Sequence, residues 1–449
     1  MEMETAENLE EPEHGWRLVE VRFDGLLGNE KQLVLNLDPD GTILTGQNGS
    51  GKSTILRAID CAQAEETWRE FAELPLDAMA LKFEDGFEVR FERGAKGVVL
   101  KGGVSGTETW EASTAPRDFE FNPESQLAAY FAAVTRHQRP PAKWMFSPDG
   151  DKTERLPWLS QLVERLNVKL VRAGRLERLE SVDLSADLEA SPGSSLSTPK
   201  SAVDLIPTNL RERIKTASAS YTRTTPQLFK DLRNSVIEEL RPTQGPATDP
   251  DTAAKEPNLE QSVQKLRDEV VSKSKSLAEL GILEAAHTSI NEDVYDPGKD
   301  GDDALVVLKA IYEAELSALE KLEDLRLRVT QFRQFANERF SGKEVVIDRE
   351  EGFKVVLPSG EDIRPSGLSS GEQHLLVLAY DLLFVTPSGS LVLIDEPELS
   401  LHVAWLRNLF TAFLDISDQR DLQFIIATHS PTILSGYGDR IQSIDELLT

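Results

Sequence analysis

The chain has 449 residues, of which 39% are hydrophobic, and a formal net charge of −28. This length allows two or three domain-sized units, and the longest aliphatic runs are far too short to span a membrane. The acidic balance argues against nonspecific capture of nucleic acid by the whole surface. With a single cysteine and an acidic start without an apolar stretch, we expect a cytoplasmic protein that lacks a signal peptide.

The N-terminal part is predicted to be mostly β structure. After a disordered acidic tail at residues 1–14, alternating apolar residues predict strands at 17–23 and 32–37. A third strand at 42–45 leads into a glycine-rich turn and a helix. Short alternating segments with glycine turns at 80–104 then predict an antiparallel meander.

Residues 181–343 are predicted to form a helical insertion that contains a flexible linker rich in Pro, Thr and Asp at 241–257. Its second half has a long apolar stripe at helical spacing. The stripe suits an antiparallel hairpin, a short coiled coil or the core face of a bundle. Its members are Leu305, Leu308, Tyr312, Leu316, Leu319, Leu322, Leu325, Val329 and Phe332.

Residues 344–449 return to strands that alternate with helices. The buried strands "LVLI" and "QFIIA" are separated by a helix, which implies a parallel sheet. We therefore assign residues 15–180 and 344–449 to the two halves of one α/β domain.

The segment "GQNGSGKST" fits the phosphate-binding pattern G-x-x-x-x-G-K-[ST] between a strand and a helix. Glycines allow successive backbone N–H groups to surround phosphate oxygens, and the following helix directs its positive end at them. Lys52 would neutralise the β- and γ-phosphates, and Ser53 would ligate Mg²⁺. The candidate residues for binding the phosphates of ATP are Gly46, Gln47, Asn48, Gly49, Ser50, Gly51, Lys52, Ser53 and Thr54.

The segment "LVLIDEPELSLH" places two carboxylates at the end of a strand buried on both faces. Asp395 is the candidate for holding Mg²⁺, and Glu396 for orienting and deprotonating the attacking water. In "QFIIATHSP", His429 follows a strand predicted to lie beside the Asp395 strand, from which its imidazole could reach a γ-phosphate.

The segment "LSSGEQ" has the spacing of a helix capping box, so a helix is predicted to start at Ser369 or Ser370. Free N–H groups, a hydroxyl and the helix dipole would form a second phosphate-binding surface there. A chain with one phosphate loop and one such surface can use both if two copies meet head to tail. The alternative is that the serines only cap their own helix.

Together these segments resemble the ABC-type ATPases of the SMC/RecF/OLD-like branch, within the AAA family ATPases of the AAA_21/AAA_15 type. "GQNGSGKST" resembles the Walker A loop, "LSSGEQ" the signature motif, "LVLIDEPELSLH" the Walker B strand and D-loop, and "THS" the switch histidine. The resemblance implies an α/β ABC-type P-loop NTPase head with an antiparallel β lobe, a mainly parallel core sheet and a helical insertion.

The resemblance also implies how the site is completed. Ser369, Ser370 and Gly371 of one protomer would act in trans on the nucleotide held by Lys52 of another, with Ser400 in the D-loop. The protein would then self-associate as a head-to-tail dimer or larger oligomer. Gly174 stands where these families have a glutamine, and the residue that stacks on adenine is unassigned, Phe23 and Trp16 being weak candidates.

Several segments, including "NERFSGKEVVID", resemble stand-alone ATPases of anti-phage systems, with the Septu ATPase the nearest type and the PARIS ATPase a looser relative. The sequence contains no HNH-like cluster, so a nuclease effector would be a separate chain. The resemblance therefore implies an ATP-hydrolysing enzyme that controls such a nuclease. The alternatives are a RecF-like DNA-repair ATPase, for which the basic stretch from Arg165 to Arg178 is a candidate surface, and an ATP-clamped scaffold with little turnover. A transporter subunit is disfavoured by the long insertion.

Overall fold

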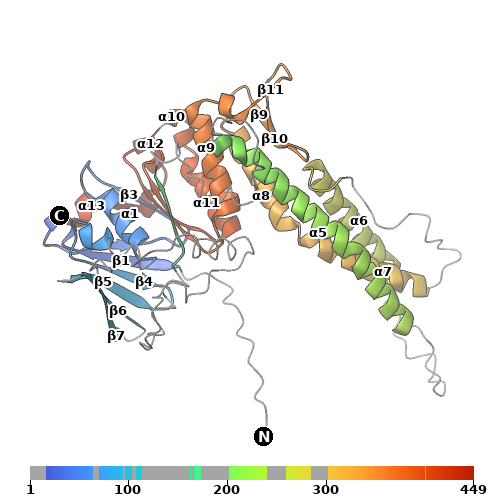
Figure 1. Cartoon of the computed structure of the whole chain (residues 1–449), viewed down its shortest axis with the longest axis horizontal. Coiled ribbons are helices and arrows are strands. Elements are labelled where there is room, and N and C mark those ends of the chain that lie inside the picture. The colour runs from blue at the N-terminus through green and yellow to red at the C-terminus, as the bar shows by residue number, and fades with distance from the viewer. Residues whose placement is uncertain are drawn as a thin grey trace, which may run out of the picture. The chain divides into compact units, whose positions relative to one another are not determined.

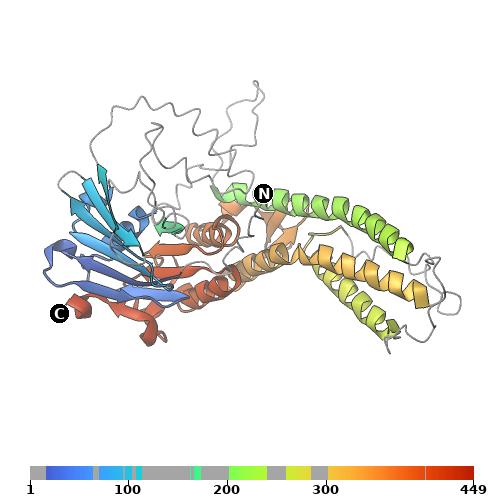
Figure 2. The ribbon, with the colours of Figure 1, turned by 90° about the horizontal axis from the view of Figure 1, so that it is seen from below.

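The structure is a computed structural model (Figures 1 and 2) and divides into two compact units, residues 1–196 with 370–449, and residues 197–369. The acidic tail and the linker predicted at 241–257 lie outside the described residues. The structure describes residues 17–63, 70–94, 97–103, 108–113, 162, 166–172, 202–239, 259–284, 302–399 and 401–448.

The first unit contains a six-stranded antiparallel sheet with the strand order β2-β1-β4-β5-β6-β7. The sheet confirms the two N-terminal strands and the meander predicted from alternating residues. Phe23 on β1 is fully buried in the core. The strands are β1 (Leu18–Asp24), β2 (Leu33–Asn36), β4 (Ala78–Phe83), β5 (Glu88–Gly94), β6 (Gly97–Gly103) and β7 (Glu108–Ser113).

The same unit contains a five-stranded sheet with the order β14-β3-β13-β12-β8, in which every neighbouring pair is parallel. This confirms the predicted parallel core sheet, and β13 lies beside β12 as expected for the strand that precedes the switch histidine. The strands are β3 (Gly41–Thr45), β8 (Val168–Arg172), β12 (Leu391–Asp395), β13 (Gln423–Ala427) and β14 (Ile441–Ser443).

Helices cover both faces of the parallel sheet. Helix α1 (Lys52–Cys61) packs on β8, β12 and β13 and shares a core cluster with Ile425 and with the antiparallel sheet. On the opposite face, Phe413 of α11 (Leu409–Arg420) stacks on Phe424 of β13 with ring centroids 5.4 Å apart. Successive β13 side chains thus contact opposite layers, which explains why the strand is apolar throughout.

Among the remaining helices of this unit, one long helix precedes β12 and short helices follow β12, β13 and β14. Helix α9 (Ser370–Tyr380) is buried from Glu372 to its end apart from Gln373, and a π-helical turn at Asp381–Val385 continues it. Its start agrees with the helix predicted to begin at Ser369 or Ser370. Three short helices are α10 (Val403–Leu406), α12 (Pro431–Leu434) and α13 (Ile444–Leu448).

A buried glutamine joins the two sheets. The Gln423 side chain accepts a hydrogen bond from the backbone N–H of Leu18 at 3.0 Å and donates to the carbonyl of Leu18 at 2.7 Å. It also donates to the carbonyl of Asp38 at 3.0 Å. Since buried polar groups need partners, these bonds fix the start of β1 against the start of β13.

The second unit is mostly helical, as predicted for the insertion. Helices α5, α6 and α7 lie side by side (Figures 1 and 2), and α7 packs against both α5 and α6, which is a bundle. The predicted stripe divides between α7 and α8 at residues 321–322, and all its members are buried except Leu316 and Leu325. The helices are α5 (Ala202–Glu239), α6 (Leu259–Glu279), α7 (Asp302–Glu320) and α8 (Glu323–Asn337).

A small antiparallel sheet, β11-β10-β9, belongs to this second unit. The unit therefore ends at residue 369, beyond the end at 343 expected for the insertion, because β10 packs on α5 and β9 packs on α8. A Cβ atom on Gly352 would lie 1.9 Å from the carbonyl oxygen of Pro207, so only glycine fits there. The strands are β9 (Glu344–Asp348), β10 (Gly352–Val356) and β11 (Asp362–Ile363).

Among the described residues, the structure has no helix that is both long enough and apolar enough to cross a membrane.

Candidate nucleotide-binding site

The glycine-rich loop connects β3 to α1, in the strand–loop–helix context that the sequence indicates. Gly49 and Gly51 adopt φ angles of 84° and 102°, a region that favours glycine. A Cβ atom on Gly51 would also lie 3.3 Å from side-chain atoms of both Leu26 and Leu27. The side chains of Gln47, Asn48 and Ser53 are exposed, so the loop is accessible to a ligand.

Lys52 is the first residue of α1 and is only 5% exposed. Its Nζ donates to the carbonyl oxygens of Gly46 at 2.9 Å and Gln47 at 3.0 Å, so the side chain lies across the loop. Burial lowers the pKa of Lys52, although the carboxylates of Glu396 and Asp445 oppose that shift. The lysine is therefore a partly desolvated cation surrounded by acidic groups.

Glu396 directly follows β12 with a φ angle of 52°, which is uncommon for a residue other than glycine. Its backbone N–H donates to the carbonyl of Ala427 at 2.9 Å, which ties the turn after β12 to the end of β13. Its Oε1 lies 3.7 Å from Nε2 of His429. Strained backbone of this kind is concentrated at functional sites, where the surrounding structure maintains it.

Asp395 ends β12, and its Oδ1 is buried without a hydrogen-bond partner within the described parts of the chain. An unpaired buried carboxylate oxygen is unfavourable, and a hard cation such as Mg²⁺ prefers oxygen ligands of this type. The donor set of Asp395 and the exposed Ser53 hydroxyl therefore fits a magnesium ion.

His429 follows β13, and its Nδ1 lies 3.5 Å from Nζ of Lys52. The structure thus brings Lys52, Glu396 and His429 together from the ends of three neighbouring parallel strands, β3, β12 and β13. In open α/β sheets, ligands bind outside the carboxyl ends of the strands.

Two carboxylates at the site, Glu398 and Asp445, were not predicted from the sequence. Oε1 of Glu398 accepts from the Thr428 hydroxyl and from the backbone N–H of His429, both at 2.8 Å. Oδ2 of Asp445 accepts from the backbone N–H of Gln47 at 2.8 Å. Glu398 was detectable as a third carboxylate in "DEPELSLH", whereas Asp445 lies 398 positions from Gln47 and no sequence pattern connects them.

The signature residues lie at the start of α9, where the capping pattern predicts a helix to begin. The side chains of Ser369 and Ser370 are exposed, and Gly371 is buried. Within the described residues, no hydrogen bond or ion pair joins Ser370 to the group around Lys52. Exposed serines at a helix start are compatible with a role toward another molecule.

Some predicted positions are not described by the structure. Ser400, Gly174 and Trp16 lie outside the described residues. Of the candidate basic surface, Lys169 forms an ion pair with Asp381 at 3.1 Å, so its charge is partly neutralised.

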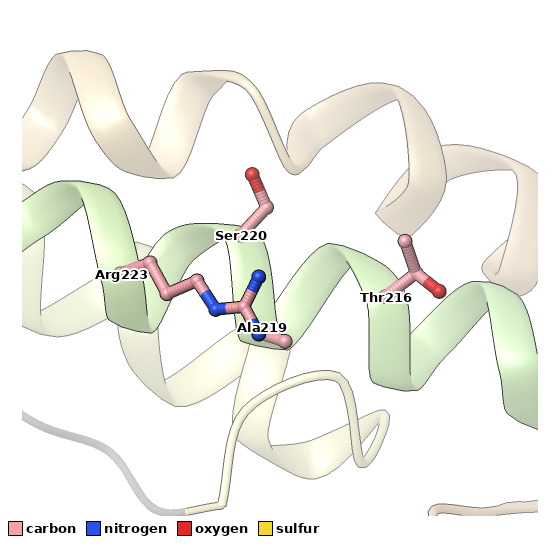
Figure 3. Close-up of a pocket in the computed structure, with 4 residues that line it drawn as sticks. All are labelled: Thr216, Ala219, Ser220 and Arg223. Atoms are coloured by element: carbon pink, nitrogen blue, oxygen red, sulfur yellow. The ribbon is translucent and has the colours of Figure 1, made fainter. Parts of the chain in front are cut away.

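A cavity of about 410 Å³ lies against α5 in the second unit (Figure 3). Its lining residues are Thr216, Ala219, Ser220 and Arg223. None of them belongs to the phosphate loop or to the strand ends, so this cavity is not the nucleotide site.

Residues 272–435 match the protein family described as "AAA domain, putative AbiEii toxin, Type IV TA system". The matched range includes the signature residues, Asp395, Glu396 and His429, and begins after the phosphate loop.

Three curated relatives align with parts of the chain. The "Retron Vc95 probable ATPase" of Vibrio cholerae is 33% identical over 104 residues, which cover 20% of each chain. "Protein ea59" of Escherichia phage lambda is 42% identical over 67 residues, covering 15% of this chain and 13% of that protein. The "Lipoprotein-releasing system ATP-binding protein LolD" of Chromohalobacter salexigens is 32% identical over 133 residues, covering 30% of this chain and 51% of that protein. The chain spans about half or less of the length of these relatives.

Solved structures of SMC head domains also align with the chain. The Smc head domain of Pyrococcus furiosus, with an extended coiled coil and bound to the C-terminal domain of ScpA, aligns at a TM-score of 0.38 and 15% identity, covering 94% and 91% of the two chains. The SMC head domain of Thermotoga maritima aligns at a TM-score of 0.36 and 12% identity, covering 95% of this chain and 94% of that chain.

Proposed function

We propose that this chain, an AAA/ABC-type ATPase, belongs to the SMC/RecF branch, and that it binds ATP at Gly46–Thr54 and hydrolyses it to ADP and phosphate in the cytoplasm. The observation that carries the proposal is the meeting of Lys52, Glu396 and His429 at the ends of three parallel strands. A phosphate loop alone binds nucleotide. A carboxylate and an imidazole beside its lysine add groups that can act on water and on the terminal phosphate.

Each residue has a separate role in the proposed reaction. The backbone N–H groups of the loop surround the phosphates, and Lys52 neutralises their charge. Glu396 orients the attacking water and accepts its proton. His429, which lies beside Lys52, donates a hydrogen bond to the terminal phosphate.

Ser53 and Asp395 would hold Mg²⁺, which would neutralise charge that develops on the phosphates. Because the described part of the chain offers no group of three or more His, Cys, Asp or Glu side chains for a metal, phosphate and water would complete its shell.

The exposed signature serines support self-association through the nucleotide. Ser369, Ser370 and Gly371 of one copy would contact the terminal phosphate held by Lys52 of another, with Ser400 in the contact between them. Each site would then need two chains, arranged head to tail in a dimer or a larger oligomer.

Glu396→Gln tests the enzymatic proposal, because the amide cannot accept the proton of the attacking water. We expect phosphate release to fall by about 10²- to 10³-fold, while ATP binding remains. Analytical ultracentrifugation should then show an ATP-dependent oligomer that the wild type forms only transiently. Glu84→Gln, which changes an exposed carboxylate of the same unit, is the matched control. Equal hydrolysis by the two variants would refute the proposal.

The biological setting is a further proposal: the ATPase controls a separate nuclease in anti-phage defence. Its support is the resemblance of the motifs to stand-alone defence ATPases and the family description, which names a toxin of a toxin–antitoxin system. We expect a nuclease gene beside the gene for this chain, and phage protection that Lys52→Ala abolishes. Protection that persists in Lys52→Ala would exclude a nucleotide-driven mechanism.

Two alternatives give different results in the same experiments. A RecF-like DNA-repair ATPase would bind DNA directly, with an affinity that ATP increases and salt decreases. An ATP-clamped scaffold would bind ATP tightly but release phosphate slowly, and Glu396→Gln would change little.

A further inference from the structure

We infer that Glu398 is a positioning residue for hydrolysis, which holds the turn that carries His429 against the turn that carries Glu396. The inference rests on the proposed ATPase function and extends it to a residue that acts through its neighbours rather than on the substrate.

Glu398 lies in the turn after β12, and its side-chain hydrogen bonds among the described residues are to the segment after β13. A single oxygen, Oε1, accepts from both the Thr428 hydroxyl and the backbone N–H of His429. The Thr428 hydroxyl in turn accepts from the backbone N–H of Ser430 at 2.9 Å. One carboxylate oxygen therefore anchors Thr428 and His429 directly, and Ser430 through the Thr428 hydroxyl, immediately before α12.

The two turns have a second connection through the backbone, where Glu396 N–H donates to the carbonyl of Ala427. Together the two connections hold the segments on either side of Glu396 and His429. This explains how the carboxylate and imidazole remain 3.7 Å apart although they come from different strands. Reacting groups must be held close to the productive geometry, since small displacements reduce rates strongly.

The environment of Glu398 argues for a structural use of its carboxylate near the catalytic groups. Thr428 is fully buried, so its hydroxyl needs a partner, and Glu398 provides it. Oε2 of Glu398 is buried without a hydrogen-bond partner among the described residues. Burying that oxygen is unfavourable. The two hydrogen bonds that Oε1 accepts from Thr428 and His429 offset this cost, and they form when the turn after β12 lies against the turn after β13.

Glu398 is not the proton acceptor in this arrangement. Its Oε1 already accepts two donors from the protein and its Oε2 is buried, whereas the Glu396 side chain is 38% exposed and lies beside the imidazole. The reach and acceptor capacity of Glu398 should therefore matter more than its charge.

Three substitutions separate reach from charge. Glu398→Gln keeps an acceptor oxygen at the same position and removes the charge. Glu398→Asp keeps the charge but is one methylene shorter, and Glu398→Ala removes both. We expect kcat within about threefold of wild type for Glu398→Gln, and a loss of about 10- to 100-fold for the other two. The Kd for ATP should stay within about threefold in all three, and Glu84→Ala serves as control.

A second measurement needs neither nucleotide nor turnover. Amide hydrogen exchange of the full chain should accelerate at residues 428–430 in Glu398→Ala and Glu398→Asp, and remain close to wild type in Glu398→Gln. If this pattern appears but the wild type does not hydrolyse ATP, the contact is established and the proposed function fails.

Two results would overturn the inference. Loss of kcat in Glu398→Gln with retention in Glu398→Asp would assign the role to the charge. Retention of both kcat and slow exchange in Glu398→Ala would show that the contact positions nothing.

Discussion

The ammonium nitrogen of Lys52 lies 3.5 Å from Nδ1 of His429, a residue 377 positions later in the chain. Because a charged lysine can only donate, Nδ1 is the acceptor in this contact, which assigns the ring proton to Nε2. Nε2 in turn lies 3.7 Å from Oε1 of Glu396. The phosphate loop, the imidazole and the carboxylate after β12 therefore form one connected polar group.

Lys52→Ala should weaken ATP binding about tenfold or more and abolish hydrolysis, because the charge opposite the phosphates is lost. Isothermal titration with ATP and a phosphate-release assay measure the two effects. Lys31→Ala, which changes an exposed lysine of the same unit, should leave both unchanged. Unaltered ATP affinity in Lys52→Ala would place the nucleotide elsewhere.

Mixing two inactive variants tests whether the signature acts in trans. If sites are shared, Lys52→Ala and Ser370→Arg should each inactivate every site in a pure oligomer. In an equal mixture, a site that pairs the intact lysine of one chain with the intact serine of the other forms with a frequency of about one quarter. We expect about a quarter of wild-type phosphate release from the mixture. No recovery above the sum of the separate variants would mean that each chain uses its own serine.

Asp445→Ala should weaken ATP binding about tenfold, because the Gln47 N–H loses its charged acceptor. Asp445→Asn keeps an acceptor oxygen without the charge, so recovery of affinity in that variant assigns the effect to the hydrogen bond. The Kd for ATP measures this series. Glu446→Gln removes a charge from the same helix and is the control. Affinity unchanged in Asp445→Ala would show that α13 does not support the loop.

Burial lowers the pKa of His374 in α9 from 6.5 to about 4. Between these values the unfolded chain binds a proton that the folded chain does not, so stability falls as the pH decreases. The contribution is complete above pH 6.5 and is lost on approach to pH 4, and it amounts to about 3 kcal/mol.

His374→Gln should therefore reduce the difference in the free energy of unfolding between pH 7 and pH 4.5. Urea unfolding at the two values measures it, with His402→Gln as control because His402 is exposed. If the difference in the free energy of unfolding between the two pH values is the same in His374→Gln as in the wild type, the folded chain already binds a proton at His374 at pH 4.5.

The sequence predicts the N-terminal strands and the meander of the first unit because their apolar residues alternate. The apolar runs that became β12 and β13 indicate a parallel sheet, and the glycine-rich loop indicates what precedes α1. Sequence periodicity could not divide the stripe at residues 321–322, since apolar residues continue at helical spacing through the break. It also could not show that β9 to β11 pack with α5 and α8, because that depends on contacts such as Gly352 against Pro207.

In the site, too, local motifs predict some residues, whereas others depend on contacts between distant parts of the chain. Lys52, Asp395, Glu396 and His429 follow from local motifs, each at the end of a strand or the start of a helix. The contacts of Glu398 and Asp445 depend on which strands are neighbours, and a single sequence does not specify this. The position of His429 could be predicted because it directly follows β13, and the sequence already predicts that this strand lies beside the Asp395 strand.

Strand order also determines the width of the site. Because β13 lies between β3 and β12, the phosphate-loop strand and the Asp395 strand are separated by two strand spacings, about 10 Å. Mg²⁺–oxygen bonds are about 2 Å long, so this interval is wide enough for a phosphoryl group and a hydrated cation side by side. Direct pairing of β3 with β12 would halve the interval and leave no room between lysine and carboxylate. The inserted strand is thus a spacer as well as the carrier of the histidine.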